Sequence, residues 1–160
     1  MQYPLKVQLF DSLQEFKRPR SLALAGILSA FAVVLNGPLT FSVSPVLEIG
    51  FGFAAVAMCA YFCGPWVAGT AGVGIDLLSY ILRPNGAFFP GFTLNEFIIG
   101  FLYGLWLYKR KPATWQARVF LCVGAYLCNV LLINYFLTPL WLHIMYGSAF
   151  KVLSQLKLIK

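Results

Sequence analysis

Charged residues are scarce in this sequence. Only 11% of its 160 residues are Asp, Glu, Lys or Arg, and only five of them are acidic. A water-soluble domain carries charge at roughly a quarter of its positions. This chain is instead 60% hydrophobic, with a mean hydropathy of +0.78. So little polar surface cannot cover a globule in water, which excludes a soluble protein and indicates an integral membrane protein.

Histidine and catalytic motifs are also lacking. The chain has a single histidine, His143, and no HExxH, GxSxG or nucleotide-binding Walker sequence. We therefore expect a protein that is not an enzyme and has no cofactor, and any ATP hydrolysis that it needs must come from another subunit. A membrane-embedded enzyme using Asp76, Glu96 and His143 is an alternative that turnover of a substrate would have to support.

The four cysteines do not form a recognisable metal or disulfide pattern. Cys59, Cys63, Cys122 and Cys128 all lie in apolar segments, and no Cys/His set has the loop spacing of a zinc site. Thiols in such segments pack as small hydrophobic groups. We expect neither a disulfide nor a metal site.

The net charge of +7 comes from basic residues in two clusters. The clusters are Lys17, Arg18 and Arg20, and Lys109, Arg110, Lys111 and Arg118. Lys and Arg beside membrane spans mark their cytoplasmic ends. The positive charge therefore indicates topology and a lipid bilayer rather than a nucleic-acid partner.

Apolar runs between these clusters predict five membrane spans. They are Ser21–Asn36, Phe51–Phe62, Trp66–Leu82, Phe92–Tyr108 and Arg118–Leu137. Gly64-Pro65 predicts a tight turn between the second and third spans. Thr138-Pro139 is expected to close the fifth, before an aromatic outer segment at Trp141–Tyr146. A sixth span would begin at Phe150, but Lys160 ends the chain before it could cross, so we expect an incomplete sixth helix.

The segment before the first span, Met1–Arg20, is polar and amphipathic. It lacks the short apolar core and small-residue cleavage site of a secretory signal peptide, so we expect it to be retained. No internal repeat or second domain is evident. The sequence therefore predicts an all-α integral membrane protein that forms a single domain over residues 1–160.

An aromatic, Pro/Gly-rich loop, GAFFPGFT, leads directly into the fourth span. Phe88, Phe89 and Phe92 supply π faces, while Pro90 and Gly91 fix the backbone conformation of the loop. On the outer face such a loop can hold flat rings. We predict that it is a ligand lid, and that Phe41–Glu48, within a second outer loop at residues 37–48, closes beside it.

Polar residues within or beside the spans are candidates for ligand contact. An ionised Asp76 in the third span costs on the order of 3 kcal/mol unless it faces a polar cavity or partner, so it is expected to point inward, toward another helix or a ligand. Asn95 and Glu96 lie one turn into the fourth span. Arg83 is the only Arg or Lys in the predicted outer loops. We expect it to contact either an anionic ligand, or Glu48, Glu96 or lipid phosphate.

Small residues recur at helical spacing in the first span. Ala25 and Ser29 form one pair, and Gly26 and Ala30 another. Small residues four apart let a second helix backbone approach closely. The pattern predicts a docking face, either inside the bundle or for another subunit.

The stretch IGFGFAAVAMCAYFCGPWVAGTAGVGIDLL, followed by GAFFPGFT and GFLYGLWLYKRK, resembles the substrate-binding S components of energy-coupling-factor (ECF) vitamin transporters, with the folate-specific branch most similar. The resemblance runs from about Leu22 to Tyr146. It implies a six-helix bundle in the bacterial cell membrane, with both termini cytoplasmic and a vitamin bound at the outer end. It also implies assembly with a transmembrane coupling subunit and two cytoplasmic ATPases, the first-span small residues docking on the coupling subunit.

Two positions depart from relatives in the family. Asn36 and Ile99 stand where many relatives have arginine. Another small aromatic vitamin, such as a pyridoxine or a thiamine precursor, is therefore an alternative to folate. A purely structural membrane subunit is a further alternative, and it predicts an outer end without a ligand-sized cavity.

Folate combines a flat pterin, a benzoyl ring and a glutamate tail with two carboxylates. We expect ring contacts from Phe88, Phe89, Phe92 and Trp141, and hydrogen bonds to the pterin from Asp76, Asn95 or Asn134. Arg83 is the candidate for the glutamate tail. The full predicted site is Phe41, Phe51, Phe53, Asp76, Arg83, Phe88, Phe89, Pro90, Gly91, Phe92, Thr93, Asn95, Asn134, Trp141 and Tyr146.

Overall fold

The computed structural model describes residues 5–36, 41–44, 47–49, 52–82, 89–110 and 114–146. Its elements in chain order are α1 (Leu5–Glu15), α2 (Pro19–Asn36), β1 (Phe41–Ser44), β2 (Leu47–Ile49), α3 (Gly52–Leu82), α4 (Pro90–Leu107), α5 (Trp115–Val130), the π-helix η1 (Leu131–Leu137) and α6 (Thr138–Tyr146). The predicted helical architecture is confirmed for these segments.

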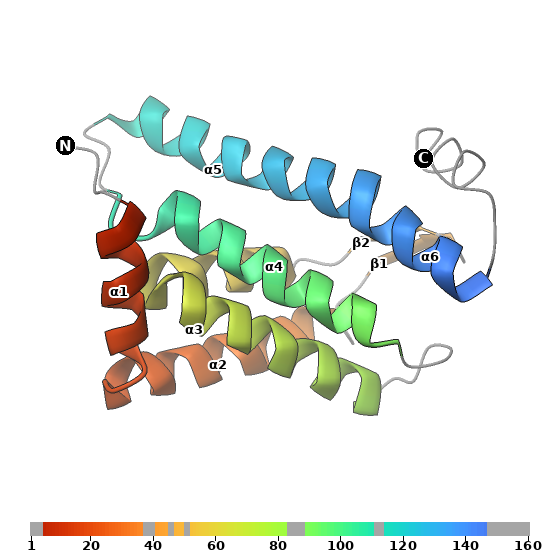
Figure 1. Ribbon diagram of the computed structural model, residues 1–160, viewed down its shortest axis with the longest axis horizontal. Helices are drawn as coiled ribbons and strands as arrows, with labels where there is room; N and C mark the ends of the chain where they lie inside the picture. Colours follow the sequence, from red (N-terminus) through yellow and green to blue (C-terminus); the bar gives the residue numbers. More distant parts are fainter. Residues whose placement is uncertain are drawn as a thin grey trace.

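Figure 1 shows the long helices running along the molecule, while α1 crosses one end of them. The chain enters α2 at that end, which we call the α1 end. The β1–β2 hairpin, the start of α4 and α6 lie at the opposite end, which we call the hairpin end (Figure 1). The long helices therefore run between two ends of the molecule that differ in structure, the α1 end and the hairpin end.

α3 is 31 residues long but contains a sharp turn at Gly64, where φ is 83° and ψ is 177°. Positive φ favours glycine, because a Cβ atom makes this conformation strained. Pro65 follows and has no N–H to donate to the preceding turn. The predicted turn between the second and third spans is therefore present, and it folds α3 into two antiparallel segments.

The second segment of α3 packs along α4 through glycines on both helices. Side chains at Gly72 and Gly100 would meet the backbones of Glu96 and Ala68, and one at Gly104 would meet Pro65. Missing side chains let two helix backbones approach closely. We call this contact between the antiparallel helices the glycine seam. It fixes which α4 residues lie beside which α3 residues.

Three helices in the described part of the chain are long and apolar enough to cross a membrane: Pro19–Asn36, Gly52–Leu82 and Trp115–Trp141. The second contains two of the predicted spans, one on each side of Gly64. The predicted fourth span forms the helix α4, which is not among these three; its first two turns carry polar Thr93, Asn95 and Glu96. The molecule is thus a helical membrane protein.

The expectation of a loop at residues 37–48 is corrected by the hairpin of β1 and β2. These strands pair antiparallel, with Phe41 opposite Ile49 and Ser42 opposite Glu48, and a bulge follows Ser42. Phe-Ser-Val-Ser alternates apolar and polar residues, which is the period of a strand. The bundle is helical as predicted, with this hairpin as its β element.

The expectation that Thr138-Pro139 ends the fifth span is wrong. The helix passes through η1 and continues as α6 to Tyr146. In η1 the hydrogen bonds reach one residue further, so the backbone N–H of Thr138 donates to the carbonyl of Ile133, to which the Thr138 hydroxyl also donates at 2.9 Å. Pro139, the second residue of α6, has no N–H to donate, and the π-helical hydrogen bonds before it let the helix continue past it. Trp141 consequently lies on the same continuous helix.

Candidate ligand-binding site

The aromatic loop is joined to α6 at the hairpin end. Phe89 is the extended residue that precedes α4, and its carbonyl accepts the N–H of Phe92 at 3.1 Å. The Phe89 ring centroid lies 5.9 Å from that of Phe92 and 5.7 Å from that of Trp141. Gly91 is buried under this cluster, and a side chain at this position would clash with the Phe89 and Trp141 rings. Three aromatic rings therefore lie together at the first turn of α4, with Phe92 edge-on and Trp141 tilted against Phe89.

Trp141 is also hydrogen-bonded to α4. Its indole Nε1 donates to Oδ1 of Asn95 at 2.9 Å, and Asn95 is only 4% exposed. A buried amide needs hydrogen-bond partners, and this bond holds the amide oxygen of Asn95 at the edge of the Trp141 indole. Tertiary structure thus brings together two predicted site residues that are 46 positions apart.

Asp76 connects α3 to α4. Its Oδ2 accepts the hydroxyl of Thr93 at 2.6 Å, and both side chains are half-buried. This is the interhelical hydrogen bond that the sequence allowed as one interpretation of Asp76. Because an ionised carboxylate has about four acceptor sites, the bond to Thr93 does not exhaust its capacity for a ligand donor.

Phe53 lies apart from this cluster. Its ring is 5.5 Å from that of Tyr126 on α5, and the side chain is 46% exposed. Pro90 is exposed at the start of α4, and six other predicted residues have no described side-chain geometry. Arg83, Phe88 and Phe51 lie outside the described residues, and the side chains of Phe41, Asn134 and Tyr146 are not described.

Asn36 has a structural contact at this end of the molecule. Its Oδ1 accepts the backbone N–H of Gly52 at 3.1 Å, which ties the end of α2 to the first residue of α3. The N–H groups of a first helical turn lack partners within the helix. The residue that departs from the family pattern therefore serves as a helix cap between two elements.

The small residues of α2 point in two directions. Ala25 is buried in the core at 7% exposure, whereas Gly26 and Ala30 are exposed and a side chain at Gly26 would meet no atom within 4 Å. Ser29 is intermediate. In the first small pair, Ala25 therefore lies in the core. Both members of the second pair, Gly26 and Ala30, lie on the surface.

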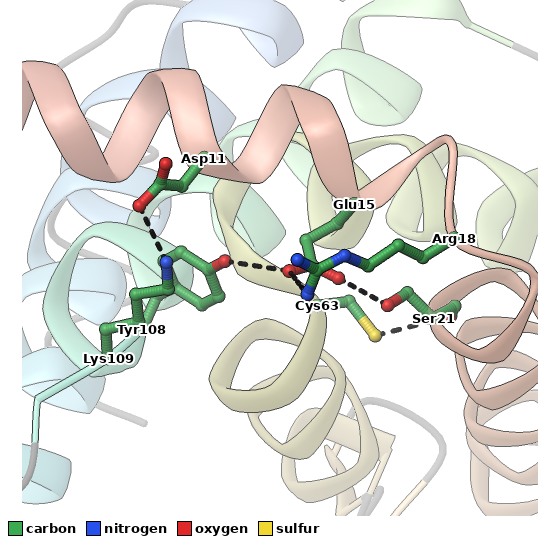
Figure 2. Close-up of polar contacts among 7 residues, drawn as sticks. All are labelled: Asp11, Glu15, Arg18, Ser21, Cys63, Tyr108 and Lys109. Atoms are coloured by element: carbon green, nitrogen blue, oxygen red, sulfur yellow. Dashed lines mark hydrogen bonds and ion pairs between the residues drawn. The ribbon is translucent and has the colours of Figure 1, made fainter.

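A polar cluster at the α1 end was not predicted. The Glu15 carboxylate, buried at 7% exposure, accepts from the Ser21 hydroxyl at 2.5 Å, the Arg18 guanidinium at 3.0 Å and the Tyr108 hydroxyl at 3.3 Å (Figure 2). Lys109 pairs with Asp11 at 2.6 Å. The spacing of Gln8, Ser12 and Glu15 along one side of a helix is the sequence signal that could have indicated it.

In the described part of the chain, no three His, Cys, Asp or Glu side chains form a group that could hold a metal ion. The described residues of the hairpin end include the rings of Phe89, Phe92 and Trp141, the Asn95 amide, the Asp76 carboxylate and the Thr93 hydroxyl. Such a set recognises a flat, nitrogen-rich ligand through stacking and hydrogen bonds.

These features define a helical membrane protein with a cluster of aromatic rings and hydrogen-bonding groups at one end. The family model for the substrate-specific component of ECF transporters matches residues 20–159, and the chain belongs to this family. It is 39% identical over 137 residues to "Folate transporter FolT" of Clostridium novyi (strain NT), covering 84% of this chain and 77% of that protein. The predicted family is confirmed.

Two further similarities point the same way. The chain is 32% identical over 130 residues to "Folate transporter FolT" of Leuconostoc mesenteroides, covering 81% of this chain and 67% of that protein. Its fold is similar to a crystal structure of FolT bound with folic acid, with a TM-score of 0.68 and 37% identity over 83% of this chain and 77% of that one.

Proposed function

We propose that this chain is the folate-binding S subunit of an ECF-type transporter. The observation that carries the proposal is the cluster of Phe89, Phe92, Trp141 and Asn95 at the hairpin end, in a chain whose relatives are named folate transporters. This end captures the vitamin, and other subunits supply the energy that moves it inward.

The pterin and benzoyl rings stack on the aromatic faces of Phe89, Phe92 and Trp141. Asn95 and Asp76 lie at the first turns of α4 and the end of α3, where they accept hydrogen bonds from the pterin amino group and ring N–H. Trp141 and Thr93 hold these two acceptors in place at 2.9 and 2.6 Å. Acceptors positioned in advance lose less side-chain entropy when the ligand binds.

Residues without described side-chain geometry complete the proposed site. Arg83 would pair with a carboxylate of the glutamate tail, because guanidinium and carboxylate form two parallel hydrogen bonds. Phe41, Phe51, Phe88, Asn134 and Tyr146 are assigned to its walls on their sequence positions. Pro90 and Gly91 set the backbone that carries the rings.

The remainder of the proposal concerns assembly. The chain would form a six-helix bundle in a bacterial cell membrane, with both termini cytoplasmic, and would dock on a transmembrane coupling subunit that is attached to two cytoplasmic ATPases. Gly26 and Ala30 are the proposed contact, since both are exposed on α2. Ala25 faces the core, which narrows the docking surface to the exposed pair and the neighbouring Ser29.

Folate binding by the purified full-length protein tests the ligand. We expect saturable binding, and we expect Trp141→Ala to weaken it by about tenfold or more, since one lost ring contact and one lost hydrogen bond together exceed about 1.4 kcal/mol. Isothermal titration calorimetry in detergent measures both affinities. Trp115→Ala is the matched control, because Trp115 is 74% exposed at the other end of the molecule.

Two outcomes would overturn this proposal. One is an absence of folate binding by the folded wild-type chain, and the other is equal affinity in wild type and Trp141→Ala. Competition by pyridoxine or thiamine precursors, together with the mass of any molecule that co-purifies, would then identify another vitamin as the ligand.

A further inference from the structure

One side of the second segment of α3 faces α4. On this side, a side chain at Gly72 would meet the Glu96 backbone, and Asp76 accepts the Thr93 hydroxyl at 2.6 Å. Residues three or four positions apart lie on the same side of a helix. Ser79 comes one turn after Asp76 and two turns after Gly72, so it continues the side of α3 that faces α4.

The antiparallel packing of the two helices also fixes which part of α4 lies beside Ser79. As α3 advances from Gly72 to Asp76, its contacts step back along α4 from Glu96 to Thr93. A further turn of α3 corresponds to about one more turn back along α4. Ser79 is therefore beside the first residues of α4, at the hairpin end that carries the cluster of aromatic rings (Figure 1).

The Ser79 hydroxyl oxygen is buried and has no hydrogen-bond partner among the described residues. A serine or threonine inside a helix commonly donates to a carbonyl of the preceding turn. Thr70 on the same helix does so, with its hydroxyl 3.1 Å from the Trp66 carbonyl oxygen and 3.0 Å from that of Val67. Because a buried polar group normally has a partner, the unpaired Ser79 hydroxyl is a candidate for ligand contact.

This hydroxyl supplies a chemical group that the proposed site otherwise has little of. Asp76 and Asn95 accept hydrogen bonds from the pterin amino group and ring N–H in the proposed complex. The same edge of the pterin carries a carbonyl oxygen next to the ring N–H, and an acceptor that leaves water needs a donor. The Ser79 hydroxyl can rotate to point its proton at such an acceptor, and it lies one helical turn from Asp76.

We propose that Ser79 is a further ligand-contact residue, and that its hydroxyl donates a hydrogen bond to the pterin carbonyl oxygen. The inference rests on the proposed function, in which folate is the ligand. Asp76 and Ser79 then bind a donor and an acceptor on one edge of the ring. A flat ligand that lacks this pair leaves one of the two side chains without a partner, and it binds more weakly for that reason.

Titration of folate into the purified full-length Ser79→Ala protein tests the proposal. We expect the affinity to fall about three- to tenfold, the size of one neutral hydrogen bond. We expect no loss of thermal stability in the absence of folate, because the hydroxyl has no partner among the described residues. Ser79→Cys, which keeps the size of the side chain but offers only a weak donor, should also lose affinity.

Thr70→Val is the matched control. It also removes one hydroxyl from α3, but at an exposed position where the hydroxyl is bonded within its own helix. Folate affinity should stay at the wild-type level in this variant. Pteroic acid, which keeps the pterin and benzoyl rings but lacks the glutamate tail, locates the contact. Ser79→Ala should weaken pteroic acid and folate by the same factor.

Each of the other outcomes has a distinct meaning. Wild-type folate affinity in both Ser79 variants would overturn the proposal and leave folate as the ligand. A loss seen with folate but not with pteroic acid would assign Ser79 to the glutamate tail and overturn the pterin contact. A lower unfolding temperature of ligand-free Ser79→Ala would show that the residue acts through packing, which overturns a direct contact. Absence of folate binding by the folded wild-type protein would instead overturn the proposed function, and this inference with it.

Discussion

Single residues determine where the long third helix turns back. At Gly64 the backbone has φ 83°, and a Cβ atom built there would lie 2.5 Å from the Ser12 hydroxyl oxygen and 3.2 Å from the Tyr108 ring. The position is therefore restricted twice, by backbone conformation and by the packing of α1. Both restrictions act at the α1 end, where Glu15 and Tyr108 also meet.

We expect Gly64→Ala to lower the free energy of unfolding by about 1 to 3 kcal/mol, from backbone strain together with the clash against Ser12. Thermal unfolding of the purified protein in detergent, followed by far-UV circular dichroism, measures the change. Gly74→Ala is the control, because a side chain at Gly74 meets no atom within 4 Å. Equal unfolding temperatures for the two variants would contradict the double restriction at Gly64.

At the scale of elements, the glycine seam between α3 and α4 sets the geometry of the candidate site. The contacts of Gly100 with Ala68 and of Gly104 with Pro65 fix the register of the two helices. The same register places Thr93 beside Asp76, with a hydrogen bond of 2.6 Å. Packing in the middle of the bundle therefore aligns polar groups near its hairpin end.

Enlarging Gly100 should disturb this register. We expect Gly100→Ala to cost about 1 to 3 kcal/mol of stability, because its Cβ meets the Ala68 backbone, which cannot move aside as a flexible side chain can. Folate affinity should also fall, since Thr93 and Asn95 shift with α4. Thermal unfolding and calorimetry report the two effects. Gly26→Ala, at an open position on α2, should leave stability and folate affinity unchanged. Wild-type stability and affinity in Gly100→Ala would show that the helices can separate enough to accept the added methyl group.

At the scale of the whole molecule, the two ends have separate properties. The hairpin end presents rings and hydrogen-bond acceptors, whereas the α1 end is held by a buried carboxylate and bordered by basic residues. The exposed pair Gly26 and Ala30 lies on α2 between them. A partner could therefore dock along α2 without contacting the candidate ligand site.

We expect Gly26→Leu to abolish assembly with the coupling subunit and transport, while folate binding stays at the wild-type level. The reason is that the added side chain enters open space on the surface of α2 and keeps a partner helix from close approach. Co-purification with the coupling subunit and uptake of labelled folate measure the loss. Gly74→Leu adds the same volume at an open position on α3 and should still assemble. Loss of folate binding in Gly26→Leu would instead make Gly26 part of the bundle's own packing.

Several structural features could be predicted from local signals. Long apolar runs predicted α2 and both segments of α3, because membrane helices need continuous hydrophobic sequence. Gly64-Pro65 predicted the turn, since both residues act on the backbone at their own position. The end of the fifth helix was missed because the proline rule assumes regular α-helical bonds, and η1 shifts them by one residue before Pro139.

The candidate site was predictable in part. Phe89, Phe92 and Trp141 stood out as aromatic residues near span ends, but their meeting depends on α6 returning beside α4. The Glu15 cluster was missed because its members come from α1, α2 and the residue after α4. The spacing of Gln8, Ser12 and Glu15 marks one polar side of the helix, but it does not show that Tyr108, 93 positions from Glu15, contacts that side.

Composition and local pattern by themselves determined that this chain is a membrane protein and where most of its helices run. These properties depend on transfer of apolar residues from water and on backbone preferences, which act residue by residue. Only the tertiary structure decided that Asn95 pairs with Trp141, that Asp76 pairs with Thr93, and that α1 buries its polar side. Those contacts join distant segments, and their geometry comes from how closely the glycine-lined helices pack.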